Sequence, residues 1–195
     1  SAILPPARPG PGQDQGTGSR LPGVPVHTTA VPGAPVPHPP LHDLVSAVAA
    51  PAAVLSDASG DLGLLGAQGA YVADRRILSV CAVSVRGHAL VPLSHAVLGG
   101  PAASFVSVVD GAGDAIPDPT VTLRRRRTVR PDGFVDSLVV SSDALVAVSL
   151  VVAVDLATDL APMAQVRENA RLDLQTPTLV EGGVQWTADD GTRIE

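Results

Sequence analysis

The stretch from Thr120 to Ser141 reads TVTLRRRRTVR, then PDG, then FVDSLVVS. Val and Thr, which favour strands, are frequent in both flanks, and the Asp-Gly pair between them is typical of a tight turn. The stretch therefore predicts two antiparallel strands joined by a short connection.

Four consecutive arginines occupy the first of these strands. Successive side chains of a strand point to opposite faces, so the run is not one basic patch. Arg124, Arg126 and Arg130 are expected on one face, and Arg125 and Arg127 on the other. Two interpretations stay open: a solvated strand whose arginines pair with neighbouring aspartates, or a contact with another domain or an anionic ligand, since a guanidinium suits bidentate carboxylate recognition.

Short runs rich in Val and Leu recur on both sides of this hairpin, separated by turn residues. They cover residues 52–56, 77–86, 89–98, 103–110, 144–156, 172–174, 178–181 and 184–188. Strands at this spacing predict an all-β fold, an antiparallel β-sandwich. Nearly every position from 145 to 154 is apolar, which predicts a central strand covered on both faces.

The first fifty residues have a different character. Residues 1–40 carry 11 of the 19 prolines and no apolar periodicity, which predicts an extended, largely disordered tail. Leu41, Leu44, Val45 and Val48 have the spacing of one short helix, with a strand as the alternative. The expected organisation is a Pro/Gly-rich tail over 1–40 and a β-domain over 41–195.

Composition excludes several classes of partner. The net charge is −6, and all 13 basic residues are arginine, so no long-range attraction to nucleic acid is expected. There is no apolar run of about 20 residues, and therefore no membrane span is expected. The start of the sequence lacks the pattern of a signal peptide, so the expected location is the cytoplasm.

No residue pattern points to catalysis, a cofactor or a metal. Cys81 is the only cysteine, which excludes an internal disulfide, and its apolar surroundings indicate a buried small hydrophobe. The histidines show no metal-ligand spacing, and no Gly-x-Ser-x-Gly elbow is present. Residues 57–61 faintly resemble a calcium loop but lack its 12-residue spacing, so a turn is expected. Glycines at every third position from 60 to 69 indicate an irregular connection.

Two segments carry a resemblance to a known family. Residues 56–61 read SDASGD and residues 69–79 read GAYVADRRILS. They resemble the N-terminal domain of bacterial glycogen debranching (amylo-α-1,6-glucosidase-type) proteins, in which a hairpin ending in Ser-Asp/Gly-Asp precedes a Gly-x-Tyr-x-x-Asp-x-Arg-x-Leu-Ser segment. The similarity continues in order to about residue 170. It departs near the end, where Asp155 and Asp159 keep a similar spacing but the family's Phe and its acidic residue before Val-Arg are missing.

The resemblance implies a supersandwich-like domain that packs beside a catalytic (α/α) barrel and helps to shape an α-glucan cleft. The hydrolytic carboxylates of the family lie in that downstream barrel, and nothing in this sequence corresponds to it, so the chain alone is not expected to be an enzyme. The implied partners are the downstream barrel and α-glucan. The candidate residues for ligand or interdomain contact are Tyr71, Asp74, Arg76, Arg124 and Arg126. For Asp74 and Arg76 the alternative is a structural pair that fixes the turn. For the whole chain it is a stand-alone structural or interaction protein without glycosidase activity.

Overall fold

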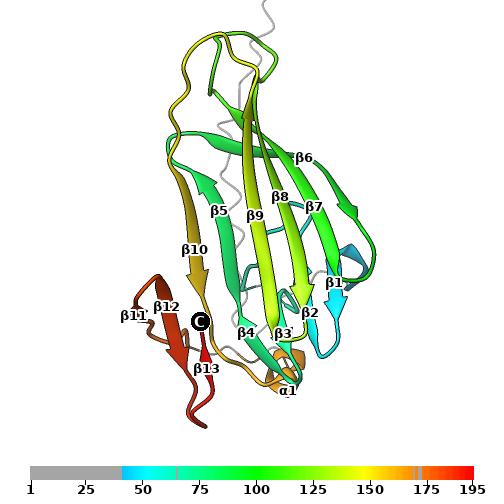
Figure 1. The fold of residues 1–195 in the computed structure, drawn as a ribbon. Helices are drawn as coiled ribbons and strands as arrows, with labels where there is room; N and C mark the ends of the chain where they lie inside the picture. Colours follow the sequence, from blue (N-terminus) through cyan, green and yellow to red (C-terminus); the bar gives the residue numbers. More distant parts are fainter. Residues whose placement is uncertain (1–40, 65, 169, 171–172) are drawn as a thin grey trace, which may run out of the picture. The chain divides into compact units, whose positions relative to one another are not determined.

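A computed structural model describes residues 41–64, 66–168, 170 and 173–195 (Figure 1). The predicted all-β, antiparallel fold is confirmed. The predicted tail over 1–40 lies outside the described residues. The elements are the 3-10 helix η1 (Leu41–Asp43), β1 (Val45–Ala49), β2 (Ala52–Ser56), β3 (Gly69–Val72), β4 (Arg75–Leu78), β5 (Val80–Val85), β6 (Ala89–Val97), β7 (Ala102–Asp110), β8 (Val121–Arg130), β9 (Gly133–Ser142), β10 (Val152–Ala157), α1 (Met163–Arg167), β11 (Thr178–Val180), β12 (Gly183–Thr187) and β13 (Arg193–Ile194).

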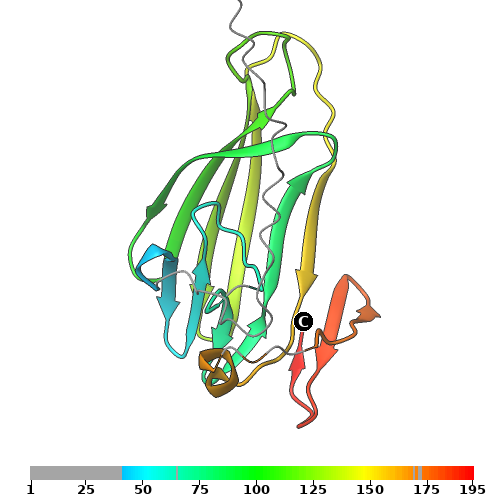
Figure 2. The ribbon, with the colours of Figure 1, turned by 180° about the vertical axis from the view of Figure 1, so that it is seen from behind.

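The strands form two facing layers (Figures 1 and 2). One layer is the sheet β6-β7-β8-β9, in which every neighbour is antiparallel. The other contains β1-β2-β3-β4 and continues, through Ser79, into β5, which pairs with β10. Contacts of β1 with β7 and β8, and of β3 with β9, bring the layers together. A separate hairpin of β11 and β12, extended by β13, follows near the end.

Small aliphatic side chains fill the space between the layers. The largest buried cluster includes Ala47, Val54, Leu62, Val129 and Trp186. Such side chains stabilise the fold in proportion to buried apolar area, at about 25 cal/mol per Å². With so few aromatic residues available, the core consists mainly of Val, Leu and Ala, as the composition indicated.

The short helix expected over 41–50 is wrong, and the strand alternative is correct. Only Leu41–Asp43 forms a helical turn, and β1 follows directly. Val45 and Ala47 point inward and Ser46 and Val48 outward, so the segment has the period of a strand and pairs with β2.

The central strand expected over 144–156 is also wrong. Strand structure is confined to β10, which pairs only with β5 and therefore lies at an edge of its sheet. Val152, Val154 and Leu156 are exposed rather than covered. Uniform apolarity indicated burial on both faces, but no described residue covers the open side of this strand.

Candidate functional site

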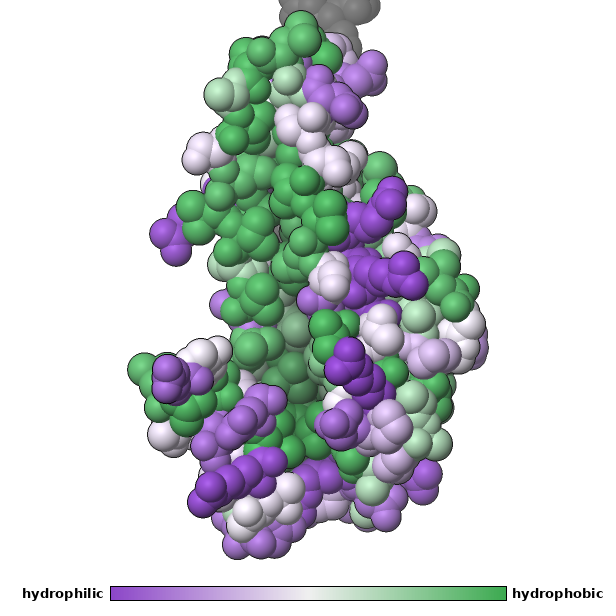
Figure 3. Space-filling model, viewed as in Figure 1, coloured by the Kyte–Doolittle hydropathy of each residue, from purple (hydrophilic) through white to green (hydrophobic). Residues whose placement is uncertain are grey.

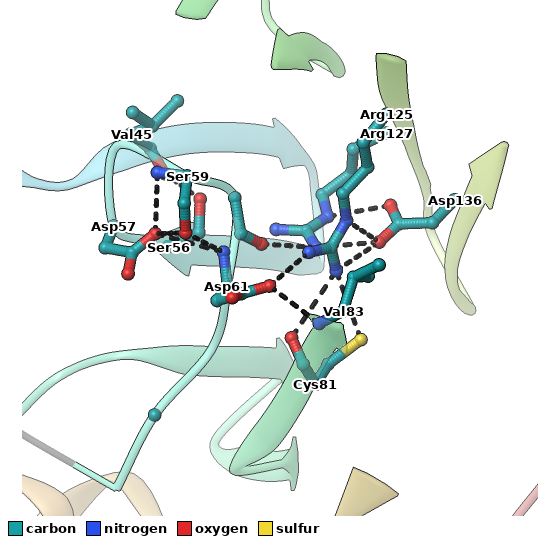
Figure 4. A network of polar contacts seen from close by, with 12 residues as sticks. Val45, Ser56, Asp57, Ser59, Asp61, Cys81, Val83, Arg125, Arg127 and Asp136 are labelled. Atoms are coloured by element: carbon teal, nitrogen blue, oxygen red, sulfur yellow. Dashed lines mark hydrogen bonds and ion pairs between the residues drawn. The ribbon is translucent and has the colours of Figure 1, made fainter. Parts of the chain in front are cut away.

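The buried polar centre of the domain is built from the inner face of β8. The predicted alternation is confirmed: Arg125 and Arg127 are buried, whereas Arg124 and Arg126 are exposed. Asp136 of β9 is the shared partner, because its carboxylate accepts from Nε of Arg125 at 2.6 Å and from Nε and Nη2 of Arg127 at 2.9 and 2.8 Å. One carboxylate thus holds two buried guanidinium groups (Figure 4).

Arg125 also reaches across to the other layer. Its Nη1 donates to Asp61 at 2.7 Å, and its Nη2 lies 3.2 Å from Sγ of Cys81. Burial alone would lower the pKa of Arg125, but the charge of Asp136 and further acidic contacts raise it above the ordinary arginine value. This guanidinium is therefore a permanent cation that joins the two layers.

Arg127 is held by aromatic rings as well as by oxygen atoms. Its guanidinium carbon lies 5.7 Å from the ring centroid of Phe105 and 5.0 Å from that of Phe134, distances at which a cation is attracted to a ring face. Nη2 donates to the carbonyl of Gly60 at 2.9 Å, while Nη1 has no partner among the described residues. A Cβ at Gly60 would lie 2.7 Å from the Phe105 ring, which explains a glycine at this point of positive φ.

The loop of residues 57–61 holds Asp61 in place. Oδ1 of Asp57 accepts from the backbone N–H groups of Ser59 and Asp61, at 2.8 and 3.0 Å, and from the Ser59 hydroxyl. Asp61 in turn accepts from Val83 at 3.1 Å besides Arg125. The predicted turn is confirmed, and Oδ1 of both aspartates accepts from protein donors. No group of three metal-binding side chains occurs in the part of the chain that the structure describes.

Cys81 is buried, as predicted. Burial raises the pKa of its thiol, and the nearby Arg125 opposes this shift without overcoming it. Burial therefore favours the neutral thiol over the thiolate.

A second buried ion pair lies in the segment that carries the family resemblance, and it explains two of the residues found there. Arg76 forms a bidentate pair with Asp159, and its Nη1 donates to the carbonyls of Gly66 and Gln68 at 3.3 and 3.2 Å. A Cβ at Gly69 would lie 2.5 Å from Cδ of Arg76, so only glycine leaves room for this side chain.

Two further residues of the same segment have structural contacts. Tyr71 pairs across the strands with Arg76 and donates from its buried hydroxyl to the carbonyl of Ala67 at 2.8 Å. Ser79, at the junction of β4 and β5, donates to the carbonyl of Ala157. The spacing of Gly69, Tyr71, Arg76 and Ser79 in this segment is therefore that of a packed hairpin.

The predicted contact residues fall into two groups. Tyr71 and Arg76 are buried, whereas Asp74, Arg124 and Arg126 are on the surface. A structural Asp74–Arg76 pair is wrong, because Arg76 pairs with Asp159 instead. A ligand or interdomain role for the five residues stays a prediction.

Sequence reasoning offered aspartates as partners of the arginines but did not identify which ones. Asp61 and Asp159 meet their arginines over separations of 64 and 83 residues, and no local signal marks them. Asp136 had a signal, since the tight β8–β9 connection that pairs Arg130 with Gly133 also sets Arg127 opposite Asp136.

An apolar groove of about 1390 Å³ opens beside β9. Its walls come from β9, from β5 and β10, and from the hairpin of β12 and β13; they include Val83, Phe134, Leu138, Leu156 and Trp186. Figure 3 shows apolar side chains gathered over β9 and β10, with a hollow between them. An exposed apolar surface of this kind is a candidate interaction site.

A second cavity, of about 420 Å³, is more polar. Asp57, Asp61, His88 and Arg125 line it, and each already has a hydrogen-bond partner within the protein. Nothing in this cavity requires a ligand.

Comparison with known proteins identifies one family. The family model for the N-terminal domain of (some) glycogen debranching enzymes matches residues 48–194. Neither a curated protein nor a solved structure matches the chain. Among the described helices, none has the length and apolarity to cross a membrane.

Proposed function

The chain belongs to the family of N-terminal domains of glycogen debranching enzymes, and from this premise we propose that it is a non-catalytic accessory domain of such an enzyme. In this role it packs beside the catalytic domain and helps to shape the cleft for α-glucan. It works where glycogen is degraded, in the cytoplasm.

The contacts of the carboxylates inside the domain support a non-catalytic role. Asp61, Asp136 and Asp159 each accept hydrogen bonds from an arginine. A glycosidase needs a carboxylic acid that stays protonated near neutral pH, usually in an apolar environment, opposite a second carboxylate. Carboxylates that accept hydrogen bonds from arginine in this way act as structural partners.

The placement of the aromatic rings supports an indirect contribution to glucan binding. Sugar rings usually stack on exposed aromatic faces, and here Tyr71, Phe105 and Trp186 are buried, while the half-buried ring of Phe134 lies against Arg127. The domain therefore contributes to glucan binding through its position beside the catalytic domain rather than by binding the polymer itself.

The test uses a branched limit dextrin as substrate. We expect the purified chain to release no glucose, and the catalytic domain of a glycogen debranching enzyme from the same organism to gain activity or thermal stability when the chain is added. Turnover by the chain alone, abolished by one Asp or Glu substitution, would contradict the proposal. So would a catalytic domain that is indifferent to the chain at saturating concentration.

A further inference from the structure

The two edges of the sheet β6-β7-β8-β9 are protected to different degrees. β6 contains Pro92, which has no N–H to offer, and an irregularity in register between Pro92 and Ser94. Both devices hinder pairing with another strand. β9 has ten residues, no proline and an unbroken register with β8, and its other edge pairs with no described strand. Only the β9 edge is open to strand addition.

Apolar surface continues from this edge into the groove. Phe134 and Leu138 of β9 form one wall, and Val154 and Leu156 of β10 form part of the other. β10 is itself at the edge of its sheet. An extended segment lying along β9 would satisfy free backbone groups and cover this apolar wall at the same time.

Two arginines of β8 lie beside β9, on the outer face of the sheet. The register places Arg124 beside Val139 and Arg126 beside Ser137, so these side chains share the outer face of the sheet. Both arginines are exposed, and neither forms an ion pair with any described residue. Their neighbours Arg125 and Arg127 form ion pairs inside with Asp61 and Asp136. The outer pair is therefore free to meet acidic groups of a partner.

We propose that the free edge of β9, the groove beneath it and the outer pair Arg124 and Arg126 form one docking surface for an extended segment of the catalytic domain. The identity of this partner rests on the proposed function. The segment adds to the sheet as a fifth strand. Its side chains alternate, with apolar residues directed into the groove and acidic residues directed outward, where they meet the two arginines.

The experiment compares two pairs of valines with matched exposure. Val135 and Val139 on β9 are 44% and 54% exposed, and Val91 and Val97 on β6 are 43% and 55% exposed. Lysine at edge positions blocks strand addition and costs little at an exposed site. Binding to the catalytic domain is measured by calorimetry for the unmodified chain, for V135K/V139K and for V91K/V97K, after circular dichroism and thermal unfolding have shown that all three are folded.

We expect V135K/V139K to weaken binding by roughly tenfold or more, and V91K/V97K by less than about twofold. R124Q/R126Q should weaken binding by several-fold and reduce its dependence on salt concentration. Hydrogen exchange should slow at amides of β9 in the complex and stay unchanged at amides of β6.

Three outcomes would overturn the docking surface. Equal binding by both lysine variants would show that the partner docks elsewhere, while the proposed function would stand. Loss of binding from V91K/V97K alone would assign the β6 edge instead. A dimer of the chain that V135K/V139K dissociates, and that competes with the catalytic domain, would make a second copy the occupant. If the unmodified chain does not bind at all, the proposed function itself fails.

Discussion

The inner and outer arginines of β8 are consecutive in sequence and differ in every physical respect. Arg125 and Arg127 are at most a few per cent exposed and share Asp136. Arg124 and Arg126, on the other face, are exposed and have no carboxylate within the described chain. The residue type is the same, so the strand's alternation and the residue on the opposite strand decide each role. A buried arginine requires a partner in its own domain, whereas an exposed arginine is free for a partner from elsewhere.

The largest effect should come from removing the carboxylate on the inner side. Asp136→Ala leaves two buried guanidinium groups without their shared partner, and we expect the free energy of unfolding to fall by about 3–5 kcal/mol. Chemical denaturation at neutral pH measures this loss. Asp155→Ala, at an exposed strand position, is the matched control and should change stability by less than about 0.5 kcal/mol.

If D136A does not fold, its free energy of unfolding cannot be measured, so Asp136→Asn provides a second test. The amide keeps the volume and one acceptor oxygen but loses the charge. We expect a clear loss of stability that is smaller than in D136A. Equal stabilities of D136N, D136A and D155A would show that the inner arginines do not depend on Asp136.

Some of this arrangement could be predicted from the sequence, and the limits have physical causes. The alternation of the arginines follows from strand geometry alone, because side chains on a strand have a period of two. The pairing of Arg130 with Gly133 would also have placed Asp136 opposite Arg127. A tight connection between two antiparallel strands fixes the register of all the residue pairs that follow. Asp61 and Asp159 belong to segments far away in sequence: the packing of the two layers brings Asp61 to Arg125, and the pairing of the segment after β10 with β4 brings Asp159 to Arg76.

The misplaced strand over 144–156 has a related cause. An apolar run indicates which side chains are favoured to be buried, but it does not indicate which segment covers them. Here Val154 and Leu156 line an open groove rather than pack against a second sheet, and Val152 is exposed. The apolar face of β10 that was expected to be covered within the domain thus forms part of the proposed docking surface.

An intermediate effect should appear at alkaline pH, on the inner side. Burial raises the pKa of the Cys81 thiol and of the Tyr71 hydroxyl. In the unfolded chain the thiol ionises near pH 8.5 and the hydroxyl near pH 10, while in the folded chain both stay protonated to higher pH. Stability is therefore complete below about pH 8.5 and declines as pH rises above that value, since the unfolded state binds fewer protons there.

Denaturation curves between pH 7.5 and 10, under reducing conditions, test this assignment. Cys81→Ala should remove the decline between about pH 8.5 and 10, whatever its stability at pH 7.5, because alanine has no proton to lose. The slope of the free energy of unfolding against pH is the quantity to compare. If the slope is the same with and without the thiol, or if stability rises in this range, Arg125 rather than burial governs Cys81.

The smallest effect on stability is expected on the outer side. Arg124→Gln with Arg126→Gln removes two exposed charges that contact no carboxylate of the described chain, and exposed charges of this kind contribute about 0–1 kcal/mol even when they are paired. Gln keeps the long side chain, so the outer face of the sheet remains covered. We expect the free energy of unfolding to change by less than about 0.5 kcal/mol, in denaturation curves measured beside those of R125Q/R127Q, whose loss should approach that of D136A. Similar losses for the two double variants would mean that the outer arginines also stabilise the domain internally, and the division of β8 into a structural face and a docking face would then be wrong. If R124Q/R126Q leaves the free energy of unfolding unchanged but still weakens binding to the catalytic domain, the two faces of β8 differ in function as well as in burial.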